Sequence, residues 1–553
     1  MPKIEVSHKD LCGLIGRKLS TEQIADYVLL AKSELDEING DILKVDIKDT
    51  NRPDLWSTEG IAREIRGRLN EKGLPQAKIK KGKVSVVVDT KSPVQPMAVC
   101  AIARGLKIDE NFLSQIIQLQ EKLSVTFGRN RKEMSMGVYD LDKIKFPVKY
   151  TSLPKQKILF APLGFQKEMT AHQILEIHQK GKEFGHLMHG DEYPVWTDAN
   201  NKILSMPPII NSNDIGNVTT KTKNVMIECT GYDMKFLQTA ISILSMQMID
   251  RGAEVETVGT LIKGKKLISP DLQPKKFYTS IGVIKKISGL DIAEKKIIEL
   301  LEMARYQCKL SGKRLELLYP SYRQDIMHER DVVEDVVISY GFNKIEPAAP
   351  KIITKGGLSE DYLLADKLCE IMAGAGFLEV LSYTLTNSEN LNGKMNVTGS
   401  YVEIENPMSS NWSVFRTSLL PGLLEFLSKN NHVEYPHAIF EVGDCVLLDN
   451  SAETRTRDSK KISAAMSSTA INYESISSAL DALFRNIGIS YQLKKSSHPS
   501  FIEGRLAEVH VGKKHIGFVG EIHPQVLNNW ALEKPVVAFE IELEEVFRIL
   551  SKR

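Results

Sequence analysis

The sequence predicts an α+β protein built from several domains. Its 553 residues exceed the size at which a single core stops growing, so we expect about three to five domains. Hydrophobic residues make up 42% of the chain, as in ordinary globular proteins. Apolar residues occur both in short continuous runs typical of buried strands, as in KVSVVVDT, and at helical spacing, as in ENFLSQIIQLQEKLSVTFG.

Composition limits the cellular setting and the class of partner. The net charge of +2 does not indicate a general nucleic-acid binder, although local basic patches are compatible with it. The six cysteines are scattered and form no CxxC pair, which argues against a zinc ribbon or a disulfide framework and favours a reducing, cytoplasmic setting. The segment MPKIEVSHKDL has no apolar signal region, and no apolar run is long enough for a membrane span.

The chain divides into four regions by pattern. Residues 1–75 contain DTNRPDLWSTEGIAREIRG, in which a turn at Asn51–Pro53 precedes a helix capped by Ser57 or Thr58. Residues 84–260 read as a mixed α/β region that includes a strand ending in ECTGYD. Residues 268–345 form a compact, helix-rich region, and residues 350–553 combine helices with several strands.

The segment RQDIMHERDVVEDVV places Asp325, Asp331, Glu334 and Asp335 within eleven positions. Valines at helical spacing predict a helix over 330–340, which places the last three carboxylates on one face. Like charges about 4 Å apart repel by roughly 4 kcal/mol near a protein surface, so the cluster needs a counterion. Oxygen ligands without His or Cys suit Mg²⁺. The alternative is neutralisation by nearby basic residues, namely Arg323, His328 and Arg330.

Several segments in series resemble one family, the β subunits of phenylalanine–tRNA ligase of the archaeal and eukaryotic type. NRPDLWSTEGIAREIRG is similar to the N-terminal signature of that family, and PSYRQDIMHERDVVEDVVISYGFNKI is similar to its metal-binding domain. NPMSSNWSVFRTSLLPGLL with FEVGD, and GRLAEVHV with GFVGEIHP, resemble its catalytic-like domain. The resemblance extends from near Pro2 to near the C-terminus, with the segments in the expected order.

The resemblance implies an identity for each region. We expect an N-terminal domain (1–75), an α/β editing domain (84–260), a small helix-rich magnesium-binding domain (268–345) and a class II synthetase-like, antiparallel-sheet catalytic-like domain (350–553). It also implies that Mg²⁺, in a site shared with an α subunit and partly through water, is bound by Asp325, Asp331, Glu334 and Asp335.

The last region lacks groups that a class II synthetase uses to hold ATP. Arg416 is present in VFRTSLLPGLL, but position 418 is Ser rather than Glu, and no Gly-rich motif ending in Arg follows. Adenylate chemistry needs cations directed at developing negative charge. We therefore expect this region to be inactive in amino-acid activation, with Arg416 structural and with Trp412 and Phe415 as core or interface residues.

An editing site is expected because a hydrophobic pocket for phenylalanine rejects the added hydroxyl of tyrosine by only about a hundredfold. Glu228 and Thr230 occupy alternate positions of a predicted strand and so share a face, while Asn211 and Ser212 lie on a loop. We expect Glu228 to bind the substrate hydroxyl or ammonium, and the hydroxyl residues to position water and shape the pocket. The alternative is that all four are ordinary polar residues at strand ends.

These expectations describe one subunit of an α₂β₂ ligase that attaches phenylalanine to tRNA(Phe) with ATP and Mg²⁺. The α chain would activate the amino acid, and this chain would supply interfaces, tRNA contacts and hydrolysis of Tyr-tRNA(Phe). Two alternatives stay open: a scaffold subunit with an inactive editing site, and a free-standing hydrolase of mischarged tRNA. The basic segment KIKKGK (78–83) is either a loop or a weak phosphate contact. The small basic patches FGRNRKE (127–133), KGKK (263–266) and SKKI (459–462) are either solvated surface or weak phosphate contacts.

Overall fold

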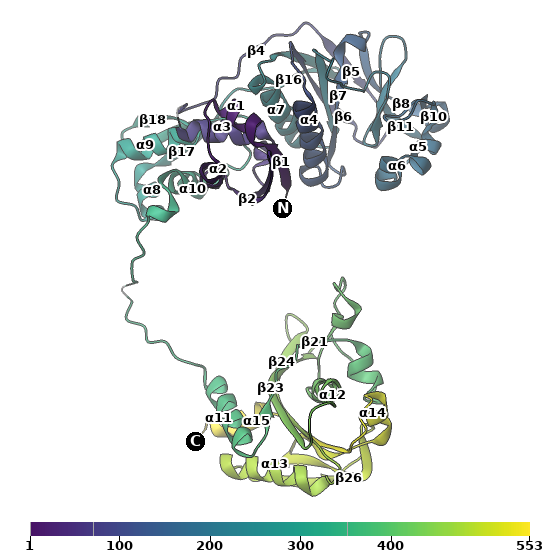
Figure 1. Cartoon of the computed structure of the whole chain (residues 1–553), viewed down its shortest axis with the longest axis vertical. Coiled ribbons are helices and arrows are strands. Elements are labelled where there is room, and N and C mark those ends of the chain that lie inside the picture. The colour runs from purple at the N-terminus through teal and green to yellow at the C-terminus, as the bar shows by residue number, and fades with distance from the viewer. Residues whose placement is uncertain (1, 70, 351, 553) are drawn as a thin grey trace. The chain divides into compact units, whose positions relative to one another are not determined.

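The computed structural model of the chain describes residues 2–69, 71–350 and 352–552. The chain combines helices with several sheets, which confirms the mixed character of the predicted α+β fold, and it divides into two compact units, Met1–Ala349 and Pro350–Arg553 (Figure 1). Among these residues, no helix has both the length and the apolar character needed to cross a bilayer.

The first unit begins with a small sheet of strand order β1-β3-β2. Its elements are β1 (Lys3–Ser7), α1 (His8–Ile15), α2 (Thr21–Leu29), β2 (Ser33–Asn39), β3 (Ile42–Ile47) and α3 (Thr58–Leu69). The hydroxyl of Ser57 accepts a hydrogen bond from the Gly60 N–H at 3.1 Å. Ser57 therefore caps α3, and it is one of the two caps that the sequence predicts.

A large mixed sheet forms the centre of the first unit. Its strand order is β13-β12-β11-β8-β5-β15-β6-β14-β7, with β4 and β16 also paired to β15. The strands are β4 (Ile79–Lys80), β5 (Ser85–Asp89), β6 (Met97–Arg104), β7 (Met134–Asp140), β8 (Val148–Pro154), β11 (Glu192–Thr197), β12 (Ile203–Met206), β13 (Ile210–Asn211), β14 (Val225–Gly231), β15 (Glu254–Ile262) and β16 (Lys265–Ser269). The helices of this region are α4 (Glu110–Lys122), α5 (Ala171–Ile177), α6 (Gln179–Phe184) and α7 (Met234–Asp250).

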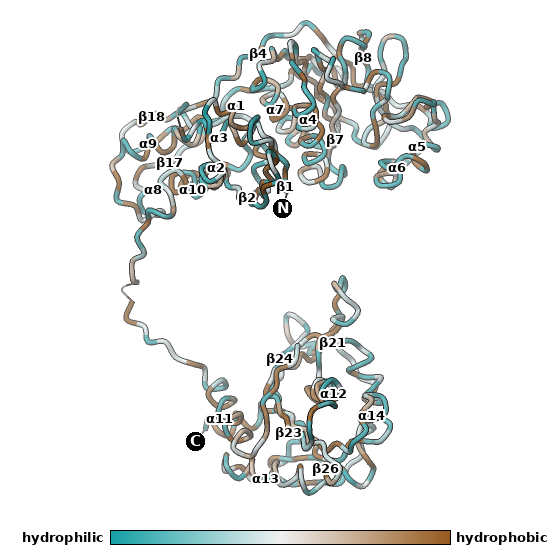
Figure 2. Tube along the Cα trace, viewed as in Figure 1, coloured by the Kyte–Doolittle hydropathy of each residue, from teal (hydrophilic) through white to brown (hydrophobic). Residues whose placement is uncertain are grey.

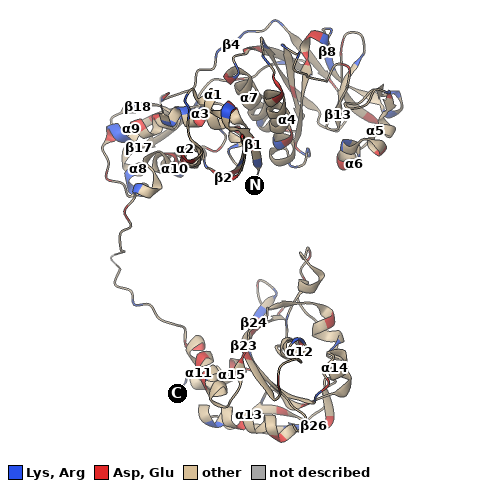
Figure 3. Cartoon of the chain, in the orientation of Figure 1, with Lys and Arg blue, Asp and Glu red and all other residues tan. Residues whose placement is uncertain are grey.

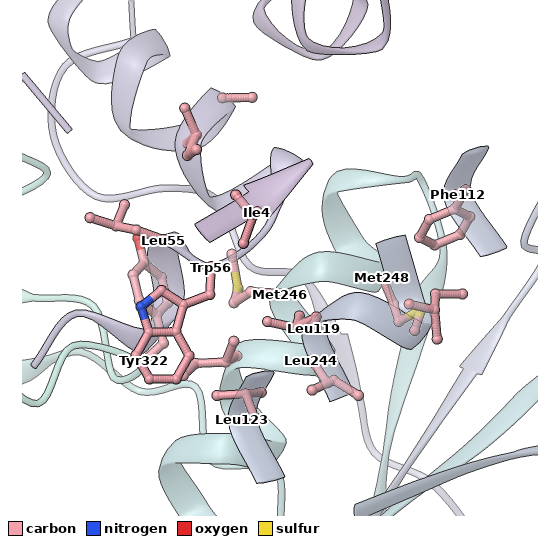
Figure 4. Close-up of a cluster of buried hydrophobic side chains, with 14 of the residues drawn as sticks. Ile4, Leu55, Trp56, Phe112, Leu119, Leu123, Leu244, Met246, Met248 and Tyr322 are labelled. Atoms are coloured by element: carbon pink, nitrogen blue, oxygen red, sulfur yellow. The ribbon is translucent and has the colours of Figure 1, made fainter. Parts of the chain in front are cut away.

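One hydrophobic core joins regions that are far apart in the sequence. Figure 4 shows Ile4 and Trp56 from the N-terminal region near Leu244 of α7 and Tyr322. All four side chains are almost fully buried. Because these regions bury apolar surface against one another, residues 1–75, the central sheet and the start of the acidic segment belong to one compact unit.

The rest of the first unit is a small α/β module that carries the acidic segment. Its sheet order is β17-β19-β18, from β17 (Lys275–Ser280), β18 (Gln307–Ser311) and β19 (Arg314–Tyr319). Its helices are α8 (Ile281–Ser288), α9 (Glu294–Met303) and α10 (Glu329–Tyr340). Helix α10 contains the helix predicted over 330–340, and the valines that form its buried stripe are Val332, Val333, Val336 and Val337.

The second unit has a largely antiparallel sheet of order β20-β23-β24-β28-β27-β26-β25. The strands are β20 (Leu378–Glu379), β23 (His437–Leu448), β24 (Thr456–Ser467), β25 (Gln492–Lys495), β26 (Phe501–Val511), β27 (Lys514–Ile522) and β28 (Val536–Glu542). Two separate cores contact this sheet. The first core contains residues of α11 (Glu360–Gly374), α13 (Tyr473–Ile487) and α15 (Glu544–Leu550). The second core contains residues of α12 (Leu420–Lys429) and α14 (Pro524–Asn529). Figure 2 shows apolar stretches along the strands of both units.

Candidate functional site

A cavity of about 210 Å³ lies in the first unit between α4, the strands β7 and β14, and the turn that joins β12 to β13. Of the four residues predicted for an editing pocket, Glu228 and Asn211 line the cavity, whereas Ser212 and Thr230 do not. The other polar residues of the lining are Gln120, Glu121, Ser124, Arg131, Ser135, Lys180 and Ser205.

Glu228 is the buried acid of this cavity. It lies in the middle of β14 and is 2% exposed. Its Oε1 accepts a hydrogen bond from the Tyr139 hydroxyl at 2.9 Å, and that hydroxyl is also 2.8 Å from the Ser205 Oγ. Glu228 Oε2 is buried and has no hydrogen bond, and the Trp196 indole, which also lacks a hydrogen-bond partner, acts on the same carboxyl. Tyr139 therefore holds one oxygen in place, and the other keeps an unused acceptor.

The environment of Glu228 favours its neutral form. Burial raises its pKa to about 8, and the Tyr139 hydroxyl and the Trp196 indole only partly oppose this rise. Glu228 forms no ion pair with any described residue. A carboxyl that is protonated near neutral pH can donate a hydrogen bond as well as accept one.

Gly137 leaves the space beside this carboxyl open. It lies directly opposite Glu228 on β7. A Cβ atom at position 137 would lie 2.8 Å from Glu228 Oε1 and 2.8 Å from the Tyr139 hydroxyl oxygen, which is closer than real Cβ contacts. Sequence analysis missed both Gly137 and Tyr139, because only strand pairing brings β7 beside β14. A glycine within the apolar stretch SMGVYDL was the available signal.

Thr230 lies behind the cavity wall and supports it. Its hydroxyl donates to Gln95 Oε1 at 2.8 Å and is 3.1 Å from the Ser135 Oγ. Ser135 also donates to the same Gln95 oxygen at 2.7 Å, and Ser135 lines the cavity. Cys229, between the two predicted residues, packs into the core on the other side of β14. Thr230 therefore acts on the cavity through Ser135.

The two residues predicted to lie on a loop, Asn211 and Ser212, differ in their relation to the cavity. Asn211 is half-buried in β13, lines the cavity and directs its amide toward the Val138 carbonyl at 3.5 Å. Ser212 is 2% exposed, and its hydroxyl accepts from the N–H groups of Ile215 and Gly216 at 3.4 Å each. Ser212 thus stabilises the turn and does not face the cavity.

Three charged side chains form one side of the cavity. Glu121 accepts from Arg131 at 2.9 Å and from Lys180 at 2.7 Å. Burial alone would raise the pKa of Glu121, but the hydrogen bond from Lys180 and the charge of Arg131 outweigh it and lower the pKa. Arg131 also donates to the carbonyls of Pro208 and Ile209 at 2.8 and 2.9 Å. These contacts tie α4 and α6 to the β12–β13 turn.

The four acidic residues predicted to bind Mg²⁺ do not share one site. Asp325 and Asp335 are buried, and both pair with Arg323. The distance from Arg323 Nη1 to Asp335 Oδ2 is 2.8 Å, and the Tyr306 hydroxyl donates to the same oxygen at 2.7 Å. Burial opposes ionisation of Asp325, but the charges of Arg323 and Arg52 hold its pKa below the usual value.

The other two carboxylates lie on the more exposed side of α10. Asp331 accepts from the N–H groups of Met327 and His328 at 2.8 and 2.6 Å, which completes a cap at the start of the helix. Glu334 accepts from Lys32 of the N-terminal region at 2.8 Å. Each of these two residues therefore meets a separate donor.

This arrangement does not fit an ion held by all four carboxylates at once. In the part of the chain that the structure describes, no group of three or more His, Cys, Asp or Glu side chains is placed to hold a metal ion. Arg323 supplies much of the neutralisation that the alternative interpretation expected, whereas Arg330 forms no ion pair with any described residue. Of the four, only the half-buried Asp331 and the exposed Glu334 are left with access to an outside ligand.

Arg416 of the second unit is enclosed by its own chain. It is 6% exposed, and its Nη1 lies 2.6 Å from Glu441 Oε1. Its Nε donates to the Asp444 carbonyl at 2.9 Å, and Ser382 donates to the other oxygen of Glu441 at 2.6 Å. These bonds hold Nε and Nη1 of Arg416 against strand β23. Trp412 is 41% exposed and packs edge-on against Tyr383.

Three family models match consecutive parts of this chain. They are described as the B3/4 domain (residues 101–257), the tRNA synthetase B5 domain (278–342) and the phenylalanyl-tRNA synthetase beta chain CLM domain (345–543). Similar proteins include the phenylalanine–tRNA ligase beta subunits of Pyrococcus horikoshii and Methanocaldococcus jannaschii. The first is 46% identical over 99% of this chain and 100% of its own length, and the second is 37% identical over 98% and 100%.

A solved structure also resembles the first unit. It is an N-terminal fragment of the phenylalanyl-tRNA synthetase beta subunit from Pyrococcus horikoshii, 46% identical, with a TM-score of 0.60, covering 62% of this chain and 100% of the fragment. The fold and the three matching models place the chain among the aminoacyl-tRNA synthetases. Within that class it belongs to the family of phenylalanine–tRNA ligase β subunits.

Proposed function

We propose that this chain combines with an α subunit in an α₂β₂ ligase for tRNA(Phe), and that it hydrolyses Tyr-tRNA(Phe) in the cavity around Glu228. The main support is the buried Glu228 carboxyl, which lines a cavity and has one oxygen bound by Tyr139 and the other without a hydrogen bond. The full-length similarity to ligase β subunits argues against a free-standing hydrolase.

The pocket distinguishes amino acids by their polar group. A tyrosyl side chain gives Glu228 Oε2 a hydroxyl partner, whereas phenylalanine leaves that buried atom unpaired. Sites built around such a buried polar group reject the analogue that lacks it by about 10⁴- to 10⁵-fold. The lining contains neither histidine nor cysteine, so we assign attack on the ester to a water molecule. Ser135 and Asn211 are the lining residues best suited to orient it.

Amino-acid activation is assigned to the α subunit. Arg416, the one cation of the second unit that resembles an ATP-binding group, is already bound by Glu441, Ser382 and the Asp444 carbonyl. ATP phosphates would have to displace a buried ion pair to reach it. We therefore propose that the second unit serves as an interface and that ATP binds to the partner.

Magnesium binding is proposed for Asp331 and Glu334, completed by ligands of the α subunit and water. Mg²⁺ commonly takes one or two carboxylates and keeps several waters. At this place the ion would neutralise α10 at a subunit contact. Metal content of the purified complex tests this: Asp331→Asn with Glu334→Gln should lose bound Mg²⁺, and Glu329→Gln, on the same helix, should keep it. Equal metal content in all three proteins would remove the assignment.

The editing proposal is tested with this chain coexpressed with its α subunit. Wild type, Glu228→Gln and Glu228→Ala are compared for hydrolysis of Tyr-tRNA(Phe) and for charging of tRNA(Phe) with phenylalanine. We expect Glu228→Ala to lose at least a hundredfold in hydrolysis and to keep normal charging. Negligible hydrolysis by wild type, with normal charging, would favour the scaffold alternative.

A further inference from the structure

The two basic segments KIKKGK and KGKK are brought together by strand β15. In the central sheet β15 pairs in parallel with β4 and β5 on one side and antiparallel with β16 on the other. The first segment includes β4 and ends just before β5, and the second forms the turn from β15 to β16. Segments about 180 residues apart in the sequence therefore lie on neighbouring strands.

The strand register aligns two lysines across four strands. Lys266 of β16 is opposite Leu261 of β15, Leu261 is opposite Val87 of β5, and Val87 is opposite Lys149 of β8. Directly paired residues project from the same face of a sheet, and neighbouring strands are about 4.8 Å apart. The two lysine backbones are thus about 14 Å apart on one face.

This face is turned to solvent. The alternate residues of the same strands, Val86, Val88 and Val258, point into a hydrophobic core and are almost fully buried. Lys266 and Lys149 are exposed, and Leu261 between them is 40% exposed. We define the lysine face as Lys149, Lys266 and Leu261, together with Ser85 at the start of β5 and Lys83, which lies two residues before that strand.

A glycine allows Lys266 to cross β15. A Cβ atom at Gly259 would lie 2.5 Å from Lys266 Cε and 3.0 Å from the Ser85 Oγ. The Lys266 side chain therefore lies over Gly259 and reaches toward β5. Ser85, which contacts the same point, lies two positions after Lys83. The missing side chain of Gly259 thus gives room for Lys266 beside the start of β5.

The positive charge of this region is not neutralised by the chain. Lys80 pairs with Glu254. Among the described residues, no ion pair is made by the other lysines of the region, which are Lys78, Lys81, Lys83, Lys149, Lys263, Lys265 and Lys266. Asp89, an exposed residue at the end of β5, also has no ion-pair partner in the described part of the chain, and it adds one negative charge to this otherwise positive region. The chain as a whole has a net charge of +2, and elsewhere its basic and acidic residues are mixed (Figure 3). The unpaired lysines of this region are therefore a local concentration of positive charge.

We propose that the lysine face binds the phosphate backbone of RNA. Lysine ammoniums are point charges suited to phosphate, and they contact the backbone without reading bases. The face shares no residue with the lining of the Glu228 cavity, so it is a separate site. The proposal rests on the proposed function in taking the RNA to be tRNA(Phe), whose position on this chain the lysine face would help to fix.

The test uses the complex of this chain with its α subunit and a tRNA(Phe) transcript. Lys83→Gln, Lys149→Gln and Lys266→Gln are combined in one variant. The control combines Lys18→Gln, Lys221→Gln and Lys295→Gln, which are exposed lysines of the same unit without ion pairs. The affinity for tRNA is measured between 50 and 200 mM salt.

We expect the first variant to bind at least tenfold more weakly at 50 mM salt, and its slope of log affinity against log salt to fall by about 2 to 3. The control should match wild type. A variant with Lys83→Arg, Lys149→Arg and Lys266→Arg keeps the charge and should keep the slope. Two results would overturn the proposal: equal slopes for the Gln variant and its control, or stronger binding of the wild-type complex to anionic vesicles than to tRNA.

Hydrolysis kinetics separate this proposal from the editing proposal. Loss of the lysine face should raise KM for Tyr-tRNA(Phe) at least tenfold and leave kcat within about twofold, because the cavity is intact. An inactive wild type would contradict the editing proposal alone, since tRNA binding is measured independently.

Discussion

The hydroxyl of Tyr139 donates a hydrogen bond to Glu228 Oε1 at 2.9 Å inside the central sheet of the first unit. The two residues lie on neighbouring strands, β7 and β14, and Ser205 of β12 contacts the same hydroxyl. Oε1 is fixed by this bond, and Oε2 is buried without a hydrogen bond. The first prediction concerns this bond.

Replacing Tyr139 by Phe removes the donor and keeps the ring. Because the donor stabilises the charged form of Glu228, its loss should raise the pKa of Glu228. A hydrogen bond to a neutral group contributes about 0.5–1.5 kcal/mol, so we expect Tyr-tRNA(Phe) hydrolysis near pH 7 to fall by roughly two- to tenfold. The midpoint of the pH–rate profile should also shift to higher pH. The hydrolysis rate is therefore measured between pH 6.5 and 9. Tyr150→Phe is the control, since the Tyr150 hydroxyl donates to the Gln95 carbonyl. Identical pH profiles for wild type and Tyr139→Phe would contradict the assignment.

The raised pKa of Glu228 should appear as pH-dependent stability. Its folded value of about 8 lies above the unfolded value, which is about 4.3. Its contribution is therefore complete below about pH 4 and is lost as the pH rises toward 8, reaching a cost of about 3–4 kcal/mol at pH 7. Glu228→Gln does not titrate, so its unfolding temperature relative to wild type should rise from pH 5 to pH 8. A difference that stays constant across this range would show that Glu228 is not buried as a titrating carboxyl.

Gly137→Ala should damage the pocket without unfolding the chain. The new methyl group would meet the Glu228 carboxyl and the Tyr139 hydroxyl, both at 2.8 Å, so one of them must move. We expect Tyr-tRNA(Phe) hydrolysis to fall tenfold or more while phenylalanine charging stays normal. Gly13→Ala, where a Cβ meets nothing within 4 Å, is the matched control. Full hydrolysis in Gly137→Ala would mean that this side of the pocket is not used.

Arg416 should matter for stability and not for chemistry. Removing one member of a buried ion pair leaves an unpaired charge and costs about 3–5 kcal/mol, whereas replacing both members is far milder. Arg416→Met should therefore lower the unfolding temperature of the purified complex, and adding Glu441→Gln should recover part of the loss. Lys429→Ala, which breaks an exposed pair with Glu425, should have little effect. A folded Arg416→Met complex that cannot form phenylalanyl-adenylate would contradict the structural role.

Local patterns in the sequence determined several features of this protein. The valine spacing predicted α10, and the alternation in ECTGYD predicted that Glu228 and Thr230 share a face with Cys229 opposite. The presence of both helices and sheets followed from the two kinds of apolar spacing. These features depend on neighbours within a few residues along the chain, where periodicity acts directly.

The tertiary structure decided which side chains meet. It joined Glu228 to Tyr139 and Gly137 across strand pairs, placed Ser212 and Thr230 outside the cavity, and bound Asp335 to Arg323. It also set Lys266 and Lys149 in one row across four strands. The order in which strands pair depends on long-range burial of apolar surface, which no local period encodes.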